Sequence, residues 1–314
     1  MTKIVVIGGG HGQSIILKGI KEIADVEISA IVTVADDGGS TGRLRQRYHL
    51  PAMGDIRNVL VALSTGDSLM HELMSFRFEG ETEEDVEGHS LGNLILTAIS
   101  SMRGSFNASI EELKDILAVK GKVLPSSLET ISLYARMDDD TIVKGEANIP
   151  NLNHHISEVF YDHEVQAYQG AVEAILEADL IIYGIGSLYT SLAPNTIIPG
   201  IREALSQTRA LRIYIANCMT QCNETFDYDL KDHVEALEKH GAPIDLILKH
   251  SDHIPSHIKE RYYETNSSEV IDHADTGKEV MGRELLDFSR NNVRHDPLKI
   301  KKAIEELICL LPAK

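Results

Sequence analysis

The chain has 314 residues, of which 43% are hydrophobic, so it is long enough to bury a substantial core as one large domain or two ordinary ones. Its 30 Lys and Arg residues stand against 48 Asp and Glu residues, and the formal charge of -18 argues against general binding to nucleic acid or to an anionic membrane. The three cysteines form no CxxC pair, and no apolar run approaches the ~20 residues of a membrane span. We therefore expect a soluble cytoplasmic protein with reduced thiols and no membrane insertion.

The first 35 residues predict a strand, a glycine loop, a helix and a second strand. An apolar β-branched run over 4–7 ends at the glycine loop 8–12, and a second strand over 28–34 completes a parallel βαβ unit. The loop lacks the dinucleotide fingerprint GxGxxG because Gln13 stands where the last glycine belongs, which weakens the case for NAD. The loop remains either a glycine turn whose helix N–H groups favour a phosphate or a tight turn without a ligand.

Residues 34–45 read VADDGGSTGRLR and follow the second predicted strand. Asp36 and Asp37 repel each other by several kcal/mol if they lie within ~4 Å at an effective dielectric of ~20, so they face different partners or a cation lies between them. We expect one to accept from a ribose hydroxyl and the other to hold Mg²⁺. The glycine N–H groups after them, with Arg43 and Arg45, then hold a diphosphate. The alternative is a solvated acidic turn followed by a basic helix start.

Residues 40–60 form a local basic island in this acidic chain. Four arginines stand there against Asp55 alone, which gives a net charge of +3. Gly54-Asp55 predicts the start of a helix, with Asp55 as its cap or first-turn acid. Further along, Ser109 to Glu112 has the pattern of a capping box and predicts a short helix.

Residues 88–93, GHSLGN, match the GxSxG nucleophile elbow of α/β-hydrolases. An elbow serine follows a buried strand, whereas residues 81–87 contain five acidic side chains and predict an exposed loop, which disfavours a hydrolase. Ser90 and Asn93 precede an apolar, helix-period run. We expect them to cap that helix or to face a substrate.

The remainder of the chain returns to an alternation of strands and helices after one excursion. Residues 129–150 predict an inserted antiparallel hairpin, with strands at 130–137 and 141–143 around a polar turn. The later predicted elements are a helix near 166–178, a strand at 180–183, a second glycine loop at 184–187, a strand at 211–216, a helix at 230–240 ending at Gly241, a strand at 244–248 and a helix that starts at Asp296-Pro297. The sequence thus predicts a single α/β domain over 1–314, with a Rossmann-like, doubly wound, mostly parallel sheet and an inserted antiparallel hairpin.

Histidines suggest a metal site only weakly. His250, His253 and His257 have the spacing HxxHxxxH, which places ligands on one face only if the segment is helical. Pro255 interrupts the segment, so we favour a solvated loop over a metal site.

Seven motifs together resemble the 2-phospho-L-lactate transferase superfamily, and specifically its bacterial gluconeogenesis-factor (YvcK-like) branch. They are GGGHG at 8–12, VADDGGSTGRLR at 34–45, GDIRN at 54–58, GHSLGNLIL at 88–96, GSLYTSLAPN at 186–195, NCMTQCNET at 217–225 and VRHDP at 293–297. The resemblance implies a Rossmann-like fold that binds a nucleotide diphosphate at the carboxyl edge of the sheet. In the transferase branch a phospholactyl group passes from a guanosine diphosphate donor to a deazaflavin, with Mg²⁺.

The YvcK-like branch is associated instead with UDP-sugar binding, growth on gluconeogenic carbon sources, and cell shape or wall synthesis. The GRLR and GDIRN segments are more similar to this branch, so we expect a regulatory factor that binds a UDP-sugar. The alternative is a Mg²⁺-dependent transferase that moves a phospho-acyl group from a nucleotide diphosphate donor. The resemblance also implies a homodimer, and a regulatory protein partner fits the first hypothesis.

The candidate site residues follow from the glycine loops, the strand ends and the resemblance. Asp36 and Asp37 are candidates for catalysis, and Asp37 is the candidate Mg²⁺ ligand. By the resemblance, Tyr262 and Arg294 fall in segments that contact the nucleotide sugar, where a tyrosine can stack on uracil and an arginine can clamp a diphosphate. The candidate nucleotide- and phosphate-binding residues are Gly9, Gly10, His11, Gly12, Gly38, Gly39, Ser40, Thr41, Arg43, Arg45, Asp55, Asn58, His89, Ser90, Asn93, Gly186, Ser187, Tyr189, Thr190, Asn217, Thr220, Tyr262 and Arg294.

Overall fold

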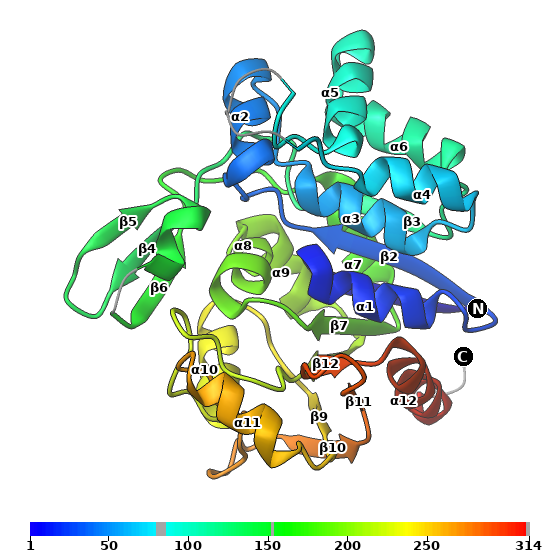
Figure 1. The fold of residues 1–314 in the computed structure, drawn as a ribbon. Helices are drawn as coiled ribbons and strands as arrows, with labels where there is room; N and C mark the ends of the chain where they lie inside the picture. The colour runs from blue at the N-terminus through cyan, green and yellow to red at the C-terminus, as the bar shows by residue number, and fades with distance from the viewer. Residues whose placement is uncertain (80–85, 152–153, 312–314) are drawn as a thin grey trace.

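A seven-stranded sheet forms the centre of the protein. The computed structural model describes residues 1–79, 86–151 and 154–311 (Figure 1). The strand order is β10-β9-β8-β7-β1-β2-β3, and every neighbouring pair is parallel. The strands are β1 (Thr2–Gly8), β2 (Val26–Val32), β3 (Lys122–Pro125), β7 (Leu180–Gly184), β8 (Leu211–Ile215), β9 (Leu246–His250) and β10 (Glu279–Arg283). The predicted doubly wound, mostly parallel sheet is confirmed.

The order of the strands changes direction between β1 and β7. From β1 the chain moves outward through β2 to β3, and from β7 it moves the opposite way through β8 and β9 to β10. Right-handed crossovers in opposite directions place helices on both faces of the sheet, so both sets of strand side chains are buried. Ile4, Val6 and Ile7 of β1 are accordingly fully buried.

Helices α1, α3 and α12 pack side by side in one layer, while α7 packs against α9 in another (Figure 1). The C-terminal helix begins as predicted, because the Asp296 carboxylate accepts from the N–H of Leu298 at 2.7 Å. The helices are α1 (Gly10–Ile20), α2 (Gly39–Tyr48), α3 (Gly54–Leu63), α4 (Ser68–Ser75), α5 (Leu91–Arg103), α6 (Phe106–Ile116), α7 (Gln169–Glu177), the π-helix η2 (Leu188–Leu192), α8 (Ala193–Thr196), α9 (Pro199–Gln207), α10 (Leu230–Lys239), α11 (Ser256–Tyr263) and α12 (Pro297–Leu310).

One predicted helix start is wrong. The capping residue of α6 is Ser105, whose hydroxyl accepts from the N–H of Ala108 at 3.3 Å. Ser109 lies inside the helix, and its hydroxyl donates to the carbonyl of Phe106 at 2.6 Å. Phe106 is buried, so packing of this aromatic residue extends the helix one turn before the predicted cap.

The inserted antiparallel segment is larger than the predicted hairpin. It is a three-stranded sheet in the order β5-β4-β6, made of β4 (Tyr134–Met137), β5 (Ile142–Lys144) and β6 (Ile156–Phe160), with the 3-10 helix η1 (Glu146–Asn151) between β5 and β6. We name it the inserted sheet. Pairing of β6 with β4 joins segments about twenty residues apart, which local sequence signals do not reveal. A second small antiparallel pair is formed by β11 (Leu286–Asp287) and β12 (Arg294–His295).

His240, at the end of α10, joins the inserted sheet to the rest of the protein. Its Nε2 accepts from the N–H of Val159 in β6 at 3.0 Å, and its Nδ1 donates to the carbonyl of Ala236 at 2.7 Å. Burial lowers the pKa of His240, which favours the neutral ring that this pair of bonds requires. Next to it, the exposed Lys239 ammonium donates to the carbonyl of Ser157 at 2.7 Å.

Replacing His240 with leucine is expected to lower the free energy of unfolding by about 1–3 kcal/mol, because the buried N–H of Val159 loses its acceptor. Lys239→Ala is the matched control, since it removes an exposed bond between the same two elements and should cost under about 1 kcal/mol. Urea unfolding of the three proteins measures both effects. Equal losses of unfolding free energy in the two variants would show that the buried bond between His240 and Val159 stabilises the protein no more than the exposed bond does.

Among residues 1–79, 86–151 and 154–311, no helix is both long enough and apolar enough to cross a bilayer.

Candidate functional site

The loops after β1, β2, β7 and β8 meet at the carboxyl edge of the sheet, where the strand order changes direction. The two glycine loops touch: a Cβ on Gly12 would lie 1.9 Å from the carbonyl oxygen of Ile185. Asn217, after β8, donates from Nδ2 to the carbonyl of Gly186 at 2.9 Å. Open α/β sheets bind ligands at such a point. We call this region the crevice, and it brings the predicted loops together from four separate parts of the chain.

The carboxylates of Asp36 and Asp37 face different partners, and the charge of Asp37 still contributes to raising the pKa of Asp36. Asp36 Oδ1 accepts from the N–H of Gly38 at 2.9 Å, in the turn that leads into α2. Asp37 Oδ1 accepts from the N–H of Ala147 at 3.1 Å, in the inserted sheet. Burial raises the pKa of Asp36, and its hydrogen bonds with Gly38 and Thr41 oppose that rise. The Asp37 carboxylate therefore also links the loop after β2 to η1 by a hydrogen bond.

The N-terminus of α1 holds a carboxyl of the chain itself. Asp55, in the first turn of α3, accepts from the N–H of Gly10, and a Cβ on Gly9 would lie 2.5 Å from Asp55 Oδ2. Burial, and then the nearby charge of Asp36, raise the pKa of Asp55 to about 7. The sequence assigned this helix N-terminus to a phosphate, but the Gly10 donor is bonded to Asp55.

Glu224 is the carboxyl that accepts from a backbone N–H at the second glycine loop, as Asp55 does at the first. Its carboxylate accepts from the N–H of Tyr189 at 3.3 Å and from the hydroxyl of Thr190 at 3.1 Å, and it also bonds the Ser187 hydroxyl. The side chain is buried, and burial raises its pKa. Gln221 donates to the Ser187 hydroxyl at 2.8 Å. The expected donors of this loop therefore have partners within the protein.

Glu146 is a member of the crevice that the sequence did not reveal. It is the first residue of η1, and burial together with the charges of Asp36, Asp55 and Glu224 raises its pKa to about 8. No motif marks it, because it comes from the inserted sheet and reaches the crevice only through tertiary packing. The pattern Gly145-Glu146 after a short strand is the sole local signal.

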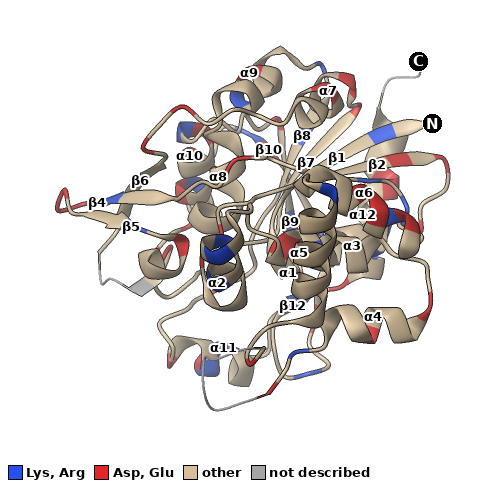
Figure 2. Cartoon of the chain, turned by 90° about the horizontal axis from the view of Figure 1, so that it is seen from above, with Lys and Arg blue, Asp and Glu red and all other residues tan. Residues whose placement is uncertain are grey.

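Helix α2 carries arginines (Figure 2, blue), and two of them, Arg43 and Arg45, have hydrogen-bond partners in the protein. Arg45 is buried and donates to the carbonyls of Ala35, Asp36 and Ile131. This is the environment of a structural arginine, and it differs from the phosphate contact expected from the sequence. Arg43 donates to the carbonyl of Glu87.

A buried polar network joins α2, α3 and α5. The hydroxyl of Ser40 bonds His89 Nδ1 at 2.8 Å and accepts from Asn93 Nδ2 at 3.2 Å. Burial, and then the charge of Arg43, lower the pKa of His89, so the ring is neutral at pH 7. Arg57 also bonds Asn93, and through Arg57 the residues Asn58 and Ser90 join the network.

Ser90 is not a nucleophile elbow. It is fully buried, it is the N-terminal cap of α5, and its hydroxyl accepts from the N–H of Asn93 at 3.2 Å. An elbow serine stands exposed on a strand-to-helix turn, whereas Ser90 itself forms an isolated antiparallel bridge with Arg77. The predicted exposed acidic loop over 81–87 lies outside the described residues, except for Val86 and Glu87.

A cavity of about 400 Å³ lies beside the 217–225 loop and is lined by Cys222, Asn223, Phe226, Tyr263, Asn266, Ser267 and Ser268. Thr220 anchors this wall, since its N–H donates to the carbonyl of Ser268 at 2.7 Å. The hydroxyl of Tyr262, one residue from the cavity lining, accepts from the N–H of Val293 at 3.2 Å. Arg294 follows Val293 in the chain and is exposed. Tyr262 and Arg294, the two residues that the resemblance implied, therefore lie in segments joined by the bond between Tyr262 and Val293.

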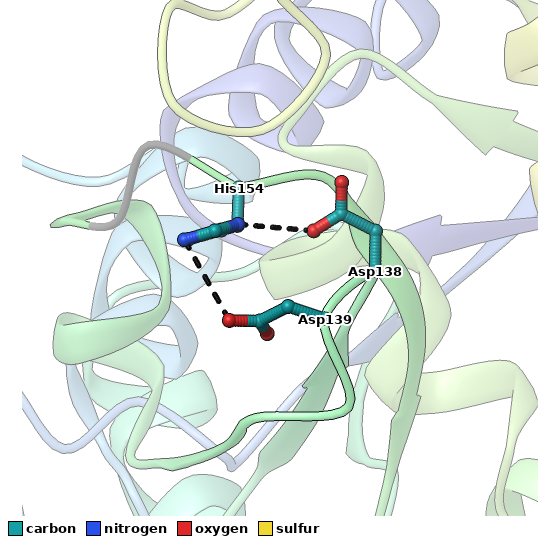
Figure 3. Close-up of side chains that lie close together, drawn as sticks. All are labelled: Asp138, Asp139 and His154. Atoms are coloured by element: carbon teal, nitrogen blue, oxygen red, sulfur yellow. Dashed lines mark hydrogen bonds and ion pairs between the residues drawn. The ribbon is translucent and has the colours of Figure 1, made fainter.

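The histidine prediction is partly wrong. His253 and His257 are exposed, but His250 is the last residue of β9 and is buried. In the part of the chain that the structure describes, one group of three side chains has metal-ligand spacing: Asp138, Asp139 and His154 (Figure 3). The two ring nitrogens of His154 each face one carboxylate, at 3.1 and 3.7 Å, and all three residues are exposed. These atoms satisfy one another and belong to the inserted sheet away from the crevice.

Comparisons with known proteins assign the chain to a family. A family model described as 2-phospho-L-lactate transferase CofD matches residues 4–287. The gluconeogenesis factor of Bacillus subtilis is 42% identical, over 98% of this chain and 98% of that protein. The putative gluconeogenesis factor of Thermotoga maritima is 40% identical, over 97% of this chain and 99% of that protein.

A solved structure is similar in fold as well. The crystal structure of a UPF0052 family member from Bacillus halodurans superimposes with a TM-score of 0.91 at 41% identity, covering 97% of this chain and 99% of that one. Sequence and fold thus agree over nearly the whole length. The chain belongs to the 2-phospho-L-lactate transferase CofD family.

Proposed function

We propose that the protein binds a nucleotide diphosphate, with a UDP-sugar as the ligand, at the crevice, and acts as a regulatory factor for growth and cell shape on gluconeogenic carbon sources. The observation that carries the proposal is the contrast between helix N-termini there. At the N-termini of α1 and η2 the carboxyls of Asp55 and Glu224 accept from N–H groups inside the helix, namely those of Gly10 and Tyr189. At α2 the nearby Asp36 carboxylate bonds the N–H of Gly38, before the helix, and the hydroxyl of Thr41.

The diphosphate is assigned to the N-terminus of α2. The first N–H groups of a helix lack partners within it and favour an anion. Gly39 has a positive φ of 43°, and no atom lies within 4 Å of the place where its Cβ would be, so ligand oxygens can approach the backbone. Ser40 and Thr41 follow in the same turn. The nucleobase is assigned to the 400 Å³ cavity, which Cys222 and Asn223 of the 217–225 loop line together with Tyr263, next to Tyr262 in the chain.

Mg²⁺ is proposed as a partner of the ligand rather than of a preformed protein cage. Within the described residues, the carboxylates of the crevice do not form a cluster of three ligand atoms, so Asp36 or Asp37 would provide one ligand and phosphate oxygens the others. The cation would offset charge repulsion between the acidic crevice and the diphosphate. A cytoplasmic homodimer with a regulatory protein partner completes the proposal, following the resemblance to the bacterial branch.

Thermal unfolding with UDP-N-acetylglucosamine, with and without Mg²⁺, tests the proposal. A ligand at 100 times its dissociation constant adds ~2.7 kcal/mol to the stability of the folded state, and we expect the gain to be larger with Mg²⁺. Guanosine diphosphate compounds are the comparison for base selectivity. Absence of saturable binding by every uridine diphosphate compound would sink the proposal.

The second candidate function is a transferase that moves a phospho-acyl group from a nucleotide diphosphate donor. The family description favours it, since the matching family is named for 2-phospho-L-lactate transfer. Release of nucleoside monophosphate in the presence of donor and acceptor, lost in Asp37→Asn, would support a reaction. Recovery of unchanged donor with every acceptor tried leaves binding alone as the function.

A further inference from the structure

Helices α4, α5 and α6 lie together at one end of the molecule, and α5 packs against both of the others (Figure 1). Along α5, four apolar residues that are spaced four, three and four positions apart are half-buried or exposed. The nucleotide site proposed above does not use them. We name them the α5 seam: Leu91, Ile95, Ala98 and Met102.

The buried residues of α5 do not account for its apolar side chains. Only one of the buried residues is large and apolar: they are Gly92, Asn93, Leu96, Thr97 and Ser100. The other large apolar residues of the helix are half-buried or exposed: Leu91, Leu94, Ile95, Ile99 and Met102. A surface helix normally turns its apolar stripe to the core and polar residues to solvent. The outer side of α5 therefore has the composition of a side that meets another apolar surface.

The spacing of the α5 seam is typical of a helix that packs on a second helix. Residues that are alternately three and four positions apart lie in one line along a helix, and apolar residues in such a line form the contact of helix pairs. Helix α4 repeats the pattern, because Leu69, Leu73 and Phe76 at its C-terminal cap are four and three positions apart and all exposed. Two neighbouring helices thus each carry an apolar line that faces solvent.

A second copy of this chain matches the α5 seam in shape. Two identical helices can pack antiparallel about a two-fold axis that passes midway between positions 96 and 97. Ile95 then lies opposite Ala98 of the second copy, and Leu91 lies opposite Met102. A large side chain faces a small one at the centre, and the flexible Met102 fills the space beside Leu91 at both ends.

The charge of this surface also favours a second copy. The chain carries a formal charge of -18, so two copies repel each other unless their contact avoids the acidic residues. Helices α4 and α5 together contain one acidic residue, Glu72, and one basic residue, Arg103, which pairs with Glu112 of α6. A basic partner would be attracted to the acidic surfaces elsewhere on the chain.

The area that a stable dimer needs brings α4 into the contact. The 13 residues of α5 span ~20 Å, and a strip of that length and ~10 Å width covers ~200 Å². A stable interface buries ~800 Å² on each partner. The exposed apolar residues of α4 lie on the helix that packs beside α5, and they enlarge the surface.

We propose that α4 and α5 form the interface of a homodimer, with the two α5 seams packed antiparallel across a two-fold axis. The inference rests on the homodimer included in the proposed function and assigns its surface. Helix α5 also begins in the buried polar network, through its cap Ser90 and through Asn93, so the dimer contact and that network share one helix.

Sedimentation equilibrium of the full chain over a range of concentrations tests the proposal. We expect the wild type to reach the mass of two chains. Ala98→Arg places an unpaired charge at the centre of the contact and is expected to remain at the mass of one chain where the wild type is paired. Ser206→Arg is the matched control, since it adds the same side chain at an exposed position of α9 and should leave the dimer intact.

A charge exchange separates loss of the contact from failure to fold. The two copies of position 98 lie ~4.5 Å apart along the helix axis, which is three residues at ~1.5 Å each. Ala98→Glu alone is therefore also expected to remain at the mass of one chain, because like charges meet across the axis. An equimolar mixture of Ala98→Arg and Ala98→Glu is expected to recover the mass of two chains, which unfolded chains could not do.

Three results would overturn the α5 contact: a dimer that persists in Ala98→Arg, a mixture that stays at the mass of one chain, or a wild type that is single at every concentration. The last result would remove the homodimer from the proposed function as well. Thermal shifts of the same proteins with UDP-N-acetylglucosamine report on the crevice separately. Binding that is retained in a single-chain variant therefore leaves the nucleotide assignment in place while the dimer is judged on its own.

Discussion

Asp55→Asn is expected to raise the free energy of unfolding at pH 8 and to leave it nearly unchanged below pH 4. Burial and the charge of Asp36 raise the pKa of Asp55 to about 7, so at pH 8 the folded protein holds a carboxylate in a site that disfavours it. Asparagine is neutral throughout this range, and its amide oxygen can still accept from the N–H of Gly10. The variant therefore removes the cost of the charge and keeps the bond.

The sign follows from the direction of the shift. Because the pKa of Asp55 in the folded state lies above its value in the unfolded chain, the folded state binds the proton more tightly. The stability that this proton contributes is fully present below about pH 4 and is lost as the pH rises through 7. A change from 3.8 to about 7 corresponds to a free energy on the order of 4 kcal/mol, which is the upper limit of the expected gain.

Urea unfolding at pH 4, 6 and 8 measures this difference between the wild type and Asp55→Asn, with the exposed substitution Asp140→Asn as control. We expect the gain to appear between pH 4 and 7 and then to level off. A gain of the same size at pH 4 would contradict the explanation. Natural proteins retain such costly groups mainly at functional sites, so the stabilised variant is expected to lose the ligand-induced thermal shift.

Gly12→Ala is expected to disrupt the contact between the two glycine loops. The new Cβ would lie 1.9 Å from the carbonyl oxygen of Ile185 and 2.4 Å from its carbonyl carbon. These are backbone atoms at the end of a central strand, and they cannot move aside as a flexible side chain can. Overpacking usually costs ~1–3 kcal/mol, and we expect about 3 kcal/mol or more here because backbone must shift.

Thermal and urea unfolding measure the loss in Gly12→Ala. The matched control is Gly282→Ala in β10. There the nearest atom to the new Cβ is the Cβ of Ser251, at an ordinary contact distance of 3.6 Å. We expect the control to change stability by no more than about 1 kcal/mol. If both variants unfold alike, the loops are not in the tight contact described above. Nucleotide binding should fall with stability in Gly12→Ala, because a shifted loop opens the crevice.

Most elements of the central fold could be predicted because their signals are local. The apolar run of β1 ends at glycines, Gly241 ends α10 with a φ of 88°, and Asp296 caps α12. The predicted antiparallel hairpin is confirmed as β4 and β5, but a third strand was missed and one helix start was wrong, and both depend on contacts that sequence patterns do not show. Strand β6 pairs with β4 from about twenty residues away, and the buried Phe106 moves the start of α6 to Ser105.

The candidate site shows the same division. The sequence placed Asp36 and Asp37 on the loop after the second strand and Asp55 at the start of the next helix, and the structure brings these two segments together. The sequence did not indicate from which hydrogen-bond donor each carboxyl would accept. Asp37 bonds Ala147, 110 positions further along, and no local pattern encodes that pairing.

The sequence by itself determined the fold class, the acidic character of the chain and the loops that end its strands, because apolar periodicity, glycine turns and charge are properties of neighbouring residues. Only the tertiary structure decided that Asp55 and Glu224 occupy two helix N-termini, that α2 begins without such a cap, and that Glu146 joins the crevice. Hydrogen-bond partners and pKa values depend on burial and on distances between segments far apart in the chain. Those quantities exist only once the chain has folded.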